Sequence, residues 1–322
     1  MRSALLGLLC LSAVTPAAAQ PTEPERCRIG VYVVGLNEFN VQRKAFEANF
    51  WLWSLCATEQ RQPLKSMEFV NAITSTATLD AVLPREGQFW SSRKVSGTFR
   101  HDWDVRNFPF DRHVIAVVME EGIDDVRALQ YEADQAKSGV DRQIELPGWR
   151  VNGFRLVQTE RRYDTTFGDP SLPVDASAEY AQLKAEITLS RDGYTSFLKL
   201  ASVVYVAATL ALLSFLFLLD SPSAFGSRIS FLAGSLFATV INMRVASTEL
   251  GSDDGLTLID LIHIVTLVLI LTVTVLTIAA DRRLHAADRD VVRGYDLRNL
   301  IACALVYVAA NVALIANAAI QG

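Results

Sequence analysis

The polar and apolar positions divide the chain into two parts of different character. In residues 20 to about 194, apolar and polar side chains are mixed and in places alternate, as in half-buried β-strands. Four long apolar segments follow, at 196–219, 229–245, 258–280 and 300–320. Because a helix needs about 20 mostly apolar residues to cross a bilayer, these segments predict transmembrane helices at about 195–219, 228–247, 258–280 and 299–320.

The second apolar segment differs from the other three because polar residues interrupt it. These residues are Gly234, Ser235, Thr239, Asn242 and Arg244. Polar side chains at membrane depth usually face a water-filled cavity or a partner. We therefore predict a membrane helix with one face exposed to water, rather than a buried helix of a soluble domain.

The first part of the chain predicts an all-β domain. Runs rich in β-branched residues occur at 28–34 and 113–119, and residues 180–190 alternate between apolar and polar. Clusters of Gly, Pro and Asp separate these runs, as expected of turns. Many short strands over about 170 residues favour a β-sandwich. The abrupt change near residue 194 predicts one domain at 20–194 and a second at 195–322.

Residues 1–19 are typical of a secretory signal peptide, with Arg2 before an apolar stretch and three alanines at 17–19. Export would place residues 20–194 outside the membrane. The connection at 248–257 then lies outside as well, and it carries Glu249, Asp253 and Asp254 but no Lys or Arg. Five arginines within 282–298 mark the opposite side as cytoplasmic. This pattern puts both the N-terminal domain and the C-terminus outside.

Composition fits this organisation and narrows the function. Of the 322 residues, 51% are hydrophobic, and the mean hydropathy is +0.24. Residues 20–194 hold 21 Lys and Arg against 26 Asp and Glu, and so carry the whole net charge of −5. With no long basic tract, a nucleic-acid partner is not expected. The sequence also lacks the GxSxG, HExxH, Walker and CxxC patterns, so we expect no enzyme activity, no cofactor and no metal centre.

Three local features of the first domain carry candidate chemistry. Cys27 and Cys56 flank a predicted hairpin, and either a disulfide or two buried thiols fits them. The acidic residues at 120, 121, 124 and 125 form either a solvated loop or an oxygen-rich site for a cation. In the loop WDVRNFPFDR at 103–112, the aromatic rings need burial, and Phe108–Pro109 is a candidate cis peptide bond.

The stretch DVRNFPFDRH resembles the signature loop of pentameric ligand-gated ion channels, the Cys-loop receptor superfamily. It is most similar to the bacterial members, which lack the two cysteines of that loop. FWLW at 50–53, PLKSMEFVN at 63–71, the segment 161–180 and Arg191 resemble further family elements in the same order. The resemblance implies a homopentamer in a bacterial inner membrane. Each subunit would have a periplasmic immunoglobulin-like β-sandwich followed by four transmembrane helices.

The resemblance also implies that the second helix of each subunit lines a central ion pore. Arg228 resembles the basic residue that opens this helix at its cytoplasmic end. Helical spacing from Arg228 gives the lining residues Ser230, Gly234, Phe237, Ile241, Arg244 and Thr248. A register shifted by one residue, with Ser235, Ala238, Asn242 and Glu249, is an alternative.

The charges near this helix bear on the selectivity of the predicted pore. No acidic residue lies between Asp220 and Glu249, and Arg244 adds positive charge, which favours anions. The acidic outer domain would instead gather cations. The pattern leans towards anions and leaves cation selectivity open.

Ligand sites of the family lie between subunits, beneath a capping loop. The candidate residues here are Tyr163, Phe167, Tyr180, Glu120 and Glu121 from one subunit, and Trp51, Trp53 and Trp90 from its neighbour. Aromatic faces with a carboxylate suit a small amine, and protons or divalent cations are alternatives. For coupling to the pore we expect a pair between Asp111 and Arg191. The rest of the signature loop, Phe108, Pro109 and Phe110, and the connection at 248–257 would take part.

Two functions of different classes therefore fit the sequence. The first is a channel that a small-molecule or ionic agonist opens in the bilayer. The second is a non-conducting, membrane-anchored periplasmic sensor or binding protein. The short cytoplasmic connection leaves no room for an output domain, which favours the channel.

Overall fold

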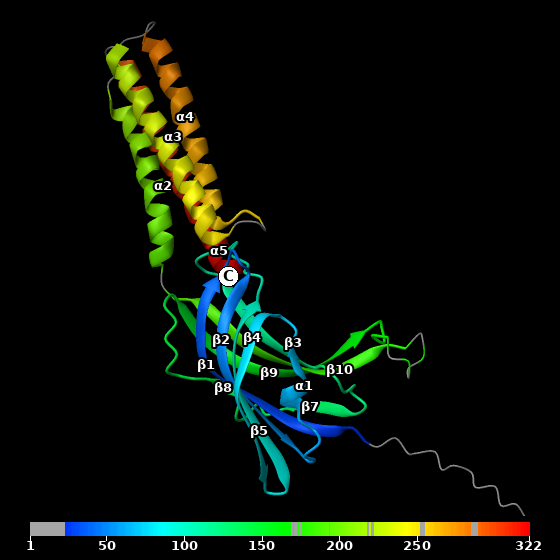
Figure 1. Ribbon diagram of the computed structural model, residues 1–322. Coiled ribbons are helices and arrows are strands. Elements are labelled where there is room, and N and C mark those ends of the chain that lie inside the picture. The colour runs from blue at the N-terminus through cyan, green and yellow to red at the C-terminus, as the bar shows by residue number, and fades with distance from the viewer. Residues whose placement is uncertain are drawn as a thin grey trace, which may run out of the picture.

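The computed structural model describes residues 23–322 except 169, 171, 172, 174, 175, 193, 218, 220, 221, 252–254 and 285–288. The predicted signal peptide at 1–19 and the two aspartates of the 248–257 connection, Asp253 and Asp254, lie outside the described residues. Two β-sheets form one end of the molecule, and four long helices extend from them (Figure 1).

The strands of the two sheets are β1 (Glu25–Asn40), β2 (Ala45–Cys56), β3 (Met67–Phe69), β4 (Ala72–Arg85), β5 (Gln88–Arg100), β6 (Arg112–Glu121), β7 (Leu129–Ala133), β8 (Gly139–Val140), β9 (Trp149–Tyr163) and β10 (Ala178–Arg191). A six-stranded sheet has the order β4-β5-β2-β1-β7, with β8 also paired to β1, and a four-stranded sheet has the order β3-β6-β10-β9. Paired strands are antiparallel, except that β7 and β8 run parallel to β1. The one-turn helix α1 (Pro63–Ser66) leads into β3.

Side-chain alternation explains why the two sheets pack against each other. β2 buries every second residue, so Phe50 and Leu52 face inward while Trp51 faces outward. Ile115 of β6 and Leu183 of β10 belong to the same hydrophobic cluster as these residues, although they lie in the other sheet. The predicted strands at 28–34, 113–119 and 180–190 lie within β1, β6 and β10. The β-rich character of this part of the chain is therefore confirmed.

β1 and β2 form the hairpin predicted between the two cysteines. Arg28 pairs with Leu55 in the antiparallel ladder, which brings Cys27 and Cys56 opposite each other. The two sulfurs are bonded at 2.02 Å. Of the two alternatives, the structure has the disulfide.

The four apolar segments form the helices α2 (Thr195–Leu213), α3 (Pro222–Leu250), α4 (Leu258–Leu284) and α5 (Arg289–Gln321). Each is long and apolar enough to cross a membrane, as predicted. α2 ends earlier than expected and is followed by a 3₁₀ turn, η1 (Ser214–Leu216). The buried Ser214 hydroxyl donates to the Ala211 carbonyl at 2.6 Å and so competes with continued helix there.

α3 and α5 both start earlier than their apolar segments. Pro222 begins α3 because proline fits the first turn of a helix, where its missing N–H is not needed. α5 begins at Arg289, and its first turns are too polar to show in a hydropathy pattern.

One hydrophobic cluster continues from between the sheets into the half of the helix bundle that is nearest to them. It contains Phe108 of the loop at 103–112 together with Phe197 of α2, Leu250 of α3 and Ala318 of α5. The C-terminal end of α5 accordingly lies beside the sheets (Figure 1). The sheets and the membrane helices thus share part of one core.

Candidate functional site

α3 has one face inside the helix bundle and one face outside it. The buried face consists of Arg228, Leu232, Ser235, Thr239, Asn242, Ala246 and Leu250. Steps of three and four residues place these side chains in one stripe. The six predicted lining residues are all exposed and lie on the opposite side of the helix. Among them, Phe237 is 67% exposed and Ile241 is 64% exposed.

The residues of the two registers considered for this helix therefore differ in how exposed their side chains are. In the shifted register, Ser235 and Asn242 are only 1% and 7% exposed and face the helix bundle of the same chain, whereas Ala238 is half-buried and Glu249 is exposed. The register that contains Phe237 and Ile241 faces away from the bundle. This face of α3 is therefore not covered by the other helices that the structure describes.

Arg228, which the resemblance placed at the opening of the helix, lies instead in its second turn and inside the bundle. It is fully buried. Its Nε donates to the Phe217 carbonyl at 2.8 Å, and its Nη2 donates to the carboxylate of Asp296 in α5 at 2.6 Å. This guanidinium therefore joins the end of η1, α3 and the start of α5, and its charge has a counter-charge within the same chain.

The Asn242 amide nitrogen has its hydrogen-bond partners within the chain, so it does not need a water-filled cavity. The Asn242 Nδ2 donates to the Leu200 carbonyl of α2 at 2.7 Å and lies 3.1 Å from Nε2 of His263 in α4. His263 Nδ1 is 2.6 Å from the Ile259 carbonyl, which can only accept, so Nδ1 carries the proton and Nε2 accepts from Asn242. One amide thus links three helices. Arg244, by contrast, is exposed.

The expected pair between Asp111 and Arg191 lies where the sheets meet the helices. Arg191 Nε donates to both carboxylate oxygens of Asp111, at 2.9 and 3.0 Å, and Asp111 is 3% exposed. The guanidinium carbon also lies 4.6 Å from the ring centre of Phe108 and 4.4 Å from that of Trp149. Arg191 ends β10, and Tyr194 directly precedes α2. The chain is therefore held by charge and by two aromatic rings just before it enters the membrane helices.

A histidine also contacts Asp111. His113 Nε2 lies 2.8 Å from the second oxygen of Asp111, and a carboxylate accepts, so this nitrogen donates. The ring of His113 packs against Trp103 and His101, with ring centres 4.9 and 5.6 Å away. Burial is the main reason why the pKa of His101 is lowered to about 4; the nearby His113 acts in the same direction, and Asp102 opposes the shift.

Other contacts join the 103–112 loop and the β1–β2 turn to the membrane helices. The backbone N–H of Leu258, at the start of α4, donates to the Arg106 carbonyl at 2.9 Å. The side chain of Gln42 donates to the Thr248 carbonyl near the end of α3. Thr257 and Asp260 cap α4 reciprocally, with Thr257 N donating to the Asp260 carboxylate at 2.9 Å.

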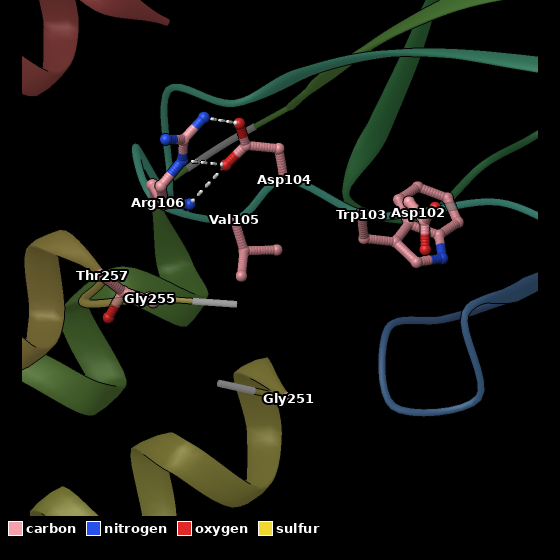
Figure 2. Close-up of a pocket in the computed structure, with 8 residues that line it drawn as sticks. All are labelled: Asp102, Trp103, Asp104, Val105, Arg106, Gly251, Gly255 and Thr257. Carbon is pink, nitrogen blue, oxygen red and sulfur yellow. Dashed lines mark hydrogen bonds and ion pairs between the residues drawn. The ribbon is translucent and has the colours of Figure 1, made fainter. Parts of the chain in front are cut away.

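A pocket of about 250 Å³ opens between the signature loop and the α3–α4 connection. Figure 2 shows Asp104 and Arg106 joined by their ion pair at one side of it, with Gly251 and Gly255 across from them. Arg106 Nε donates to Asp104 at 2.8 Å, and the hydrogen bonding of this side chain is the main reason why the pKa of Asp104 is lowered. The pocket marks a place where the loop and the connection come close without filling the space between them.

Three of the predicted ligand residues form an aromatic cluster at the β9–β10 end of the smaller sheet. The ring centre of Tyr163 lies 5.3 Å from that of Phe167 and 6.1 Å from that of Tyr180. The Tyr163 hydroxyl donates to Glu120 at 2.7 Å, which is the main cause of a raised Tyr163 pKa. Gln182 donates to the other Glu120 oxygen at 2.6 Å. The cluster therefore combines aromatic faces with one carboxylate, whose residue is 7% exposed.

Glu121 does not join this cluster, contrary to expectation. Consecutive strand residues point to opposite faces, and Glu121 is 1% exposed. Its carboxylate accepts from the hydroxyls of Ser66 and Tyr131 at 2.7 and 2.8 Å. Burial is the main reason why the pKa of Tyr131 is raised well above its ordinary value. Glu121 thus ties β6 to β7 and α1.

The other acidic residues of the 120–125 cluster are also paired. Asp124 accepts from Arg61 at 2.5 Å, and Asp125 pairs with Arg127. These pairs favour the interpretation of an ordinary loop over that of an oxygen-rich cation site.

The predicted tryptophans lie on the larger sheet, whereas the Tyr163 cluster lies on the smaller one. Trp51 and Trp53 point outward from β2, and Trp90 lies on β5 opposite Leu55. Trp53 Nε1 donates to Asp134 at 3.1 Å, and the Lys94 ammonium lies 5.8 Å from the Trp51 ring centre. The two predicted halves of the ligand site are therefore separate in a single chain.

Several residues of these contacts were not predicted from the sequence. Asp296, Trp149 and His263 each complete a contact whose other member was predicted. An acidic residue near the start of a membrane helix is a signal that could have identified Asp296, because such a charge needs a partner.

No protein-family model matches the chain, and no curated protein matches it.

Proposed function

We propose that this chain is the subunit of a homopentameric ligand-gated ion channel in a bacterial inner membrane. In this proposal the sheets form a periplasmic immunoglobulin-like sandwich, and α3 of each subunit lines a central pore. An agonist bound between neighbouring subunits opens the pore. The observation that carries the proposal is the exposed face of α3.

That face suits a pore because it combines small, polar and apolar residues. In a pentamer, five copies of Phe237 and five of Ile241 would form two hydrophobic rings. Such constrictions can block ions by dewetting. Ser230, Gly234 and Thr248 lie above and below these rings on the same face, where they would line wider parts of the pore.

The contacts between sheets and helices support transmission of a binding signal. Arg191 joins the residues just before α2 to Asp111 and Phe108 of the signature loop. Arg106 and Gln42 contact the two ends of the α3–α4 connection. A movement of the sheets would therefore act directly on both ends of that connection.

The ligand site is proposed at the contact between two subunits. One subunit supplies Glu120 with Tyr163, Phe167 and Tyr180, and the neighbour supplies Trp51, Trp53 and Trp90. A site shared by two subunits takes each half from a different chain. The distance between the Tyr163 cluster and the tryptophans within one chain is consistent with such a site. Aromatic faces around a carboxylate favour a small organic ammonium ion.

Cysteine accessibility tests the proposal against the non-conducting sensor. In a Cys303→Ala background, single cysteines replace the six lining residues, with Ser235→Cys and Asn242→Cys as buried controls. A pore predicts that a charged, water-soluble thiol reagent labels the lining positions and spares the controls. In a sensor without a pore the same face would lie in lipid, and protection of all six positions would contradict the proposal.

A further inference from the structure

We infer that the permeant ions are inorganic anions and that Arg244 sets this preference. The inference rests on the proposed function, because it needs the exposed face of α3 to line a pore. It names the class of ion that the pore selects and the side chain responsible.

The first step is that Arg228 contributes little to the field in the pore. Its guanidinium is fully buried on the opposite face of α3 and paired with Asp296 at 2.6 Å. A paired charge inside each subunit is close to neutral when seen from the lumen. The cytoplasmic end of the helix therefore carries no ring of free positive charge from this residue.

The second step is that no acidic side chain shares the exposed face. From Pro222 to Thr248 the only charged residues are Arg228 and Arg244. Glu249 lies next to Thr248 and is exposed, but one step along the helix turns it about 100° away from Thr248, and it lines a cavity of about 500 Å³ with Lys199 of α2 and Phe39 of β1. That cavity lies at the junction with the sheets, so Glu249 belongs to a different side of α3.

The third step is the position of Arg244 itself. It is exposed, and no salt bridge of Arg244 occurs among the residues that the structure describes. It lines an open hollow with Gln42 and Thr248 on the outer side of the bundle. At 1.5 Å per residue it lies about 4.5 Å beyond Ile241 along the helix. An entering ion would meet five guanidinium groups just before the hydrophobic rings.

The acidic outer domain does not outweigh this ring. Charges farther from an ion than about 8 Å are largely screened at physiological ionic strength. The ring acts at contact distance, whereas most carboxylates of residues 20–194 lie on the sheets, outside the membrane part. Rings of Arg or Lys are the usual means by which pores favour anions.

The experiment uses the full chain in planar bilayers and needs no agonist. The double substitution Phe237→Ala with Ile241→Ala removes the hydrophobic rings and provides an open background. Reversal potentials in a KCl gradient then give the chloride-to-potassium permeability ratio. We expect a ratio above about ten in the background, at least a roughly fivefold fall with Arg244→Gln, and a ratio below about one with Arg244→Glu.

Two further variants separate charge from folding. Arg244→Lys keeps the positive charge and is expected to keep the chloride-to-potassium permeability ratio of the background. Lys199→Gln removes a positive charge at a similar depth outside the proposed lumen and is expected to leave the ratio unchanged. A cation-selective background, or an unchanged ratio in Arg244→Gln, overturns the inference and leaves the channel proposal standing. Pentamers that carry no current in any variant contradict the proposed function itself.

Discussion

Arg228 and Asp296 form an ion pair at 2.6 Å inside the helix bundle, where the first side chain is fully buried and the second residue is 5% exposed. Removing one member of a buried pair leaves an uncompensated charge, which typically costs about 3–5 kcal/mol. We expect Asp296→Asn to lower the free energy of unfolding by about that amount. Thermal unfolding in detergent measures the change.

A double-substitution cycle controls for this interpretation. Arg228→Met combined with Asp296→Leu should cost less than the sum of the two single changes, because no charge is left unpaired. The exposed Arg298→Gln in the same helix should change stability by no more than about 0.5 kcal/mol. Additive single effects would show that the two side chains do not act as a pair.

The contact between Arg191 and Asp111 predicts a loss of gating without a loss of assembly. Arg191→Ala and Asp111→Ala both break the link between the signature loop and the start of α2. We expect pentamers of normal mass by light scattering but no agonist-evoked current. Arg191→Lys keeps the charge but not the planar group between Phe108 and Trp149, so its agonist-evoked current should be smaller than that of the wild type. Wild-type currents from either alanine variant would refute the coupling role.

The aromatic cluster predicts a charge-dependent ligand site. Glu120→Gln removes the carboxylate next to Tyr163 and should weaken binding of an organic ammonium probe such as propylamine by about tenfold, because the cation loses its counter-charge. The matched control is Glu160→Gln, which removes an exposed carboxylate on the same strand as Tyr163 and should leave binding unchanged. Quenching of tryptophan fluorescence measures both. Equal affinities in all three proteins would remove Glu120 from the site.

His101 predicts a loss of stability in acid. Its pKa is lowered from the ordinary value of 6.5 to about 4 in the folded protein, mainly by burial. Between these two values the unfolded chain binds more protons, so the stabilisation is complete above about pH 6.5 and is lost as the pH falls towards 4. The unfolding temperature should therefore fall over this window, and it should fall less in His101→Gln. An identical pH dependence in both proteins would exclude His101 as the cause.

The coarse architecture could be predicted because each part of the chain has a strong local signal. Bilayer thickness requires long apolar runs, and half-buried strands require alternation, so the helices and the β-rich domain both show in the sequence. Helical spacing predicts two opposite faces for α3 but leaves two registers open, and only the packing of the bundle places Ser235 and Asn242 on the buried face. Strand alternation also separates Glu120 from Glu121, whereas the family resemblance assigned both to one site.

The partners of these residues could not be predicted in the same way. Arg228 and Asp296 are 68 positions apart, and their meeting depends on how α3 and α5 pack. The stacking of Trp149 on Arg191 likewise depends on the pairing of β9 with β10. Contacts of this kind come from tertiary structure, which local patterns do not contain.

Asn242 holds α3 against two neighbours through a single nitrogen, which bonds Leu200 of α2 and faces His263 of α4. Any turn of α3 about its own axis that carries this nitrogen away must give up both interactions in one movement. The amide therefore favours a single rotational orientation of α3. We expect rotation away from that orientation to be an all-or-none step, because both contacts are lost together.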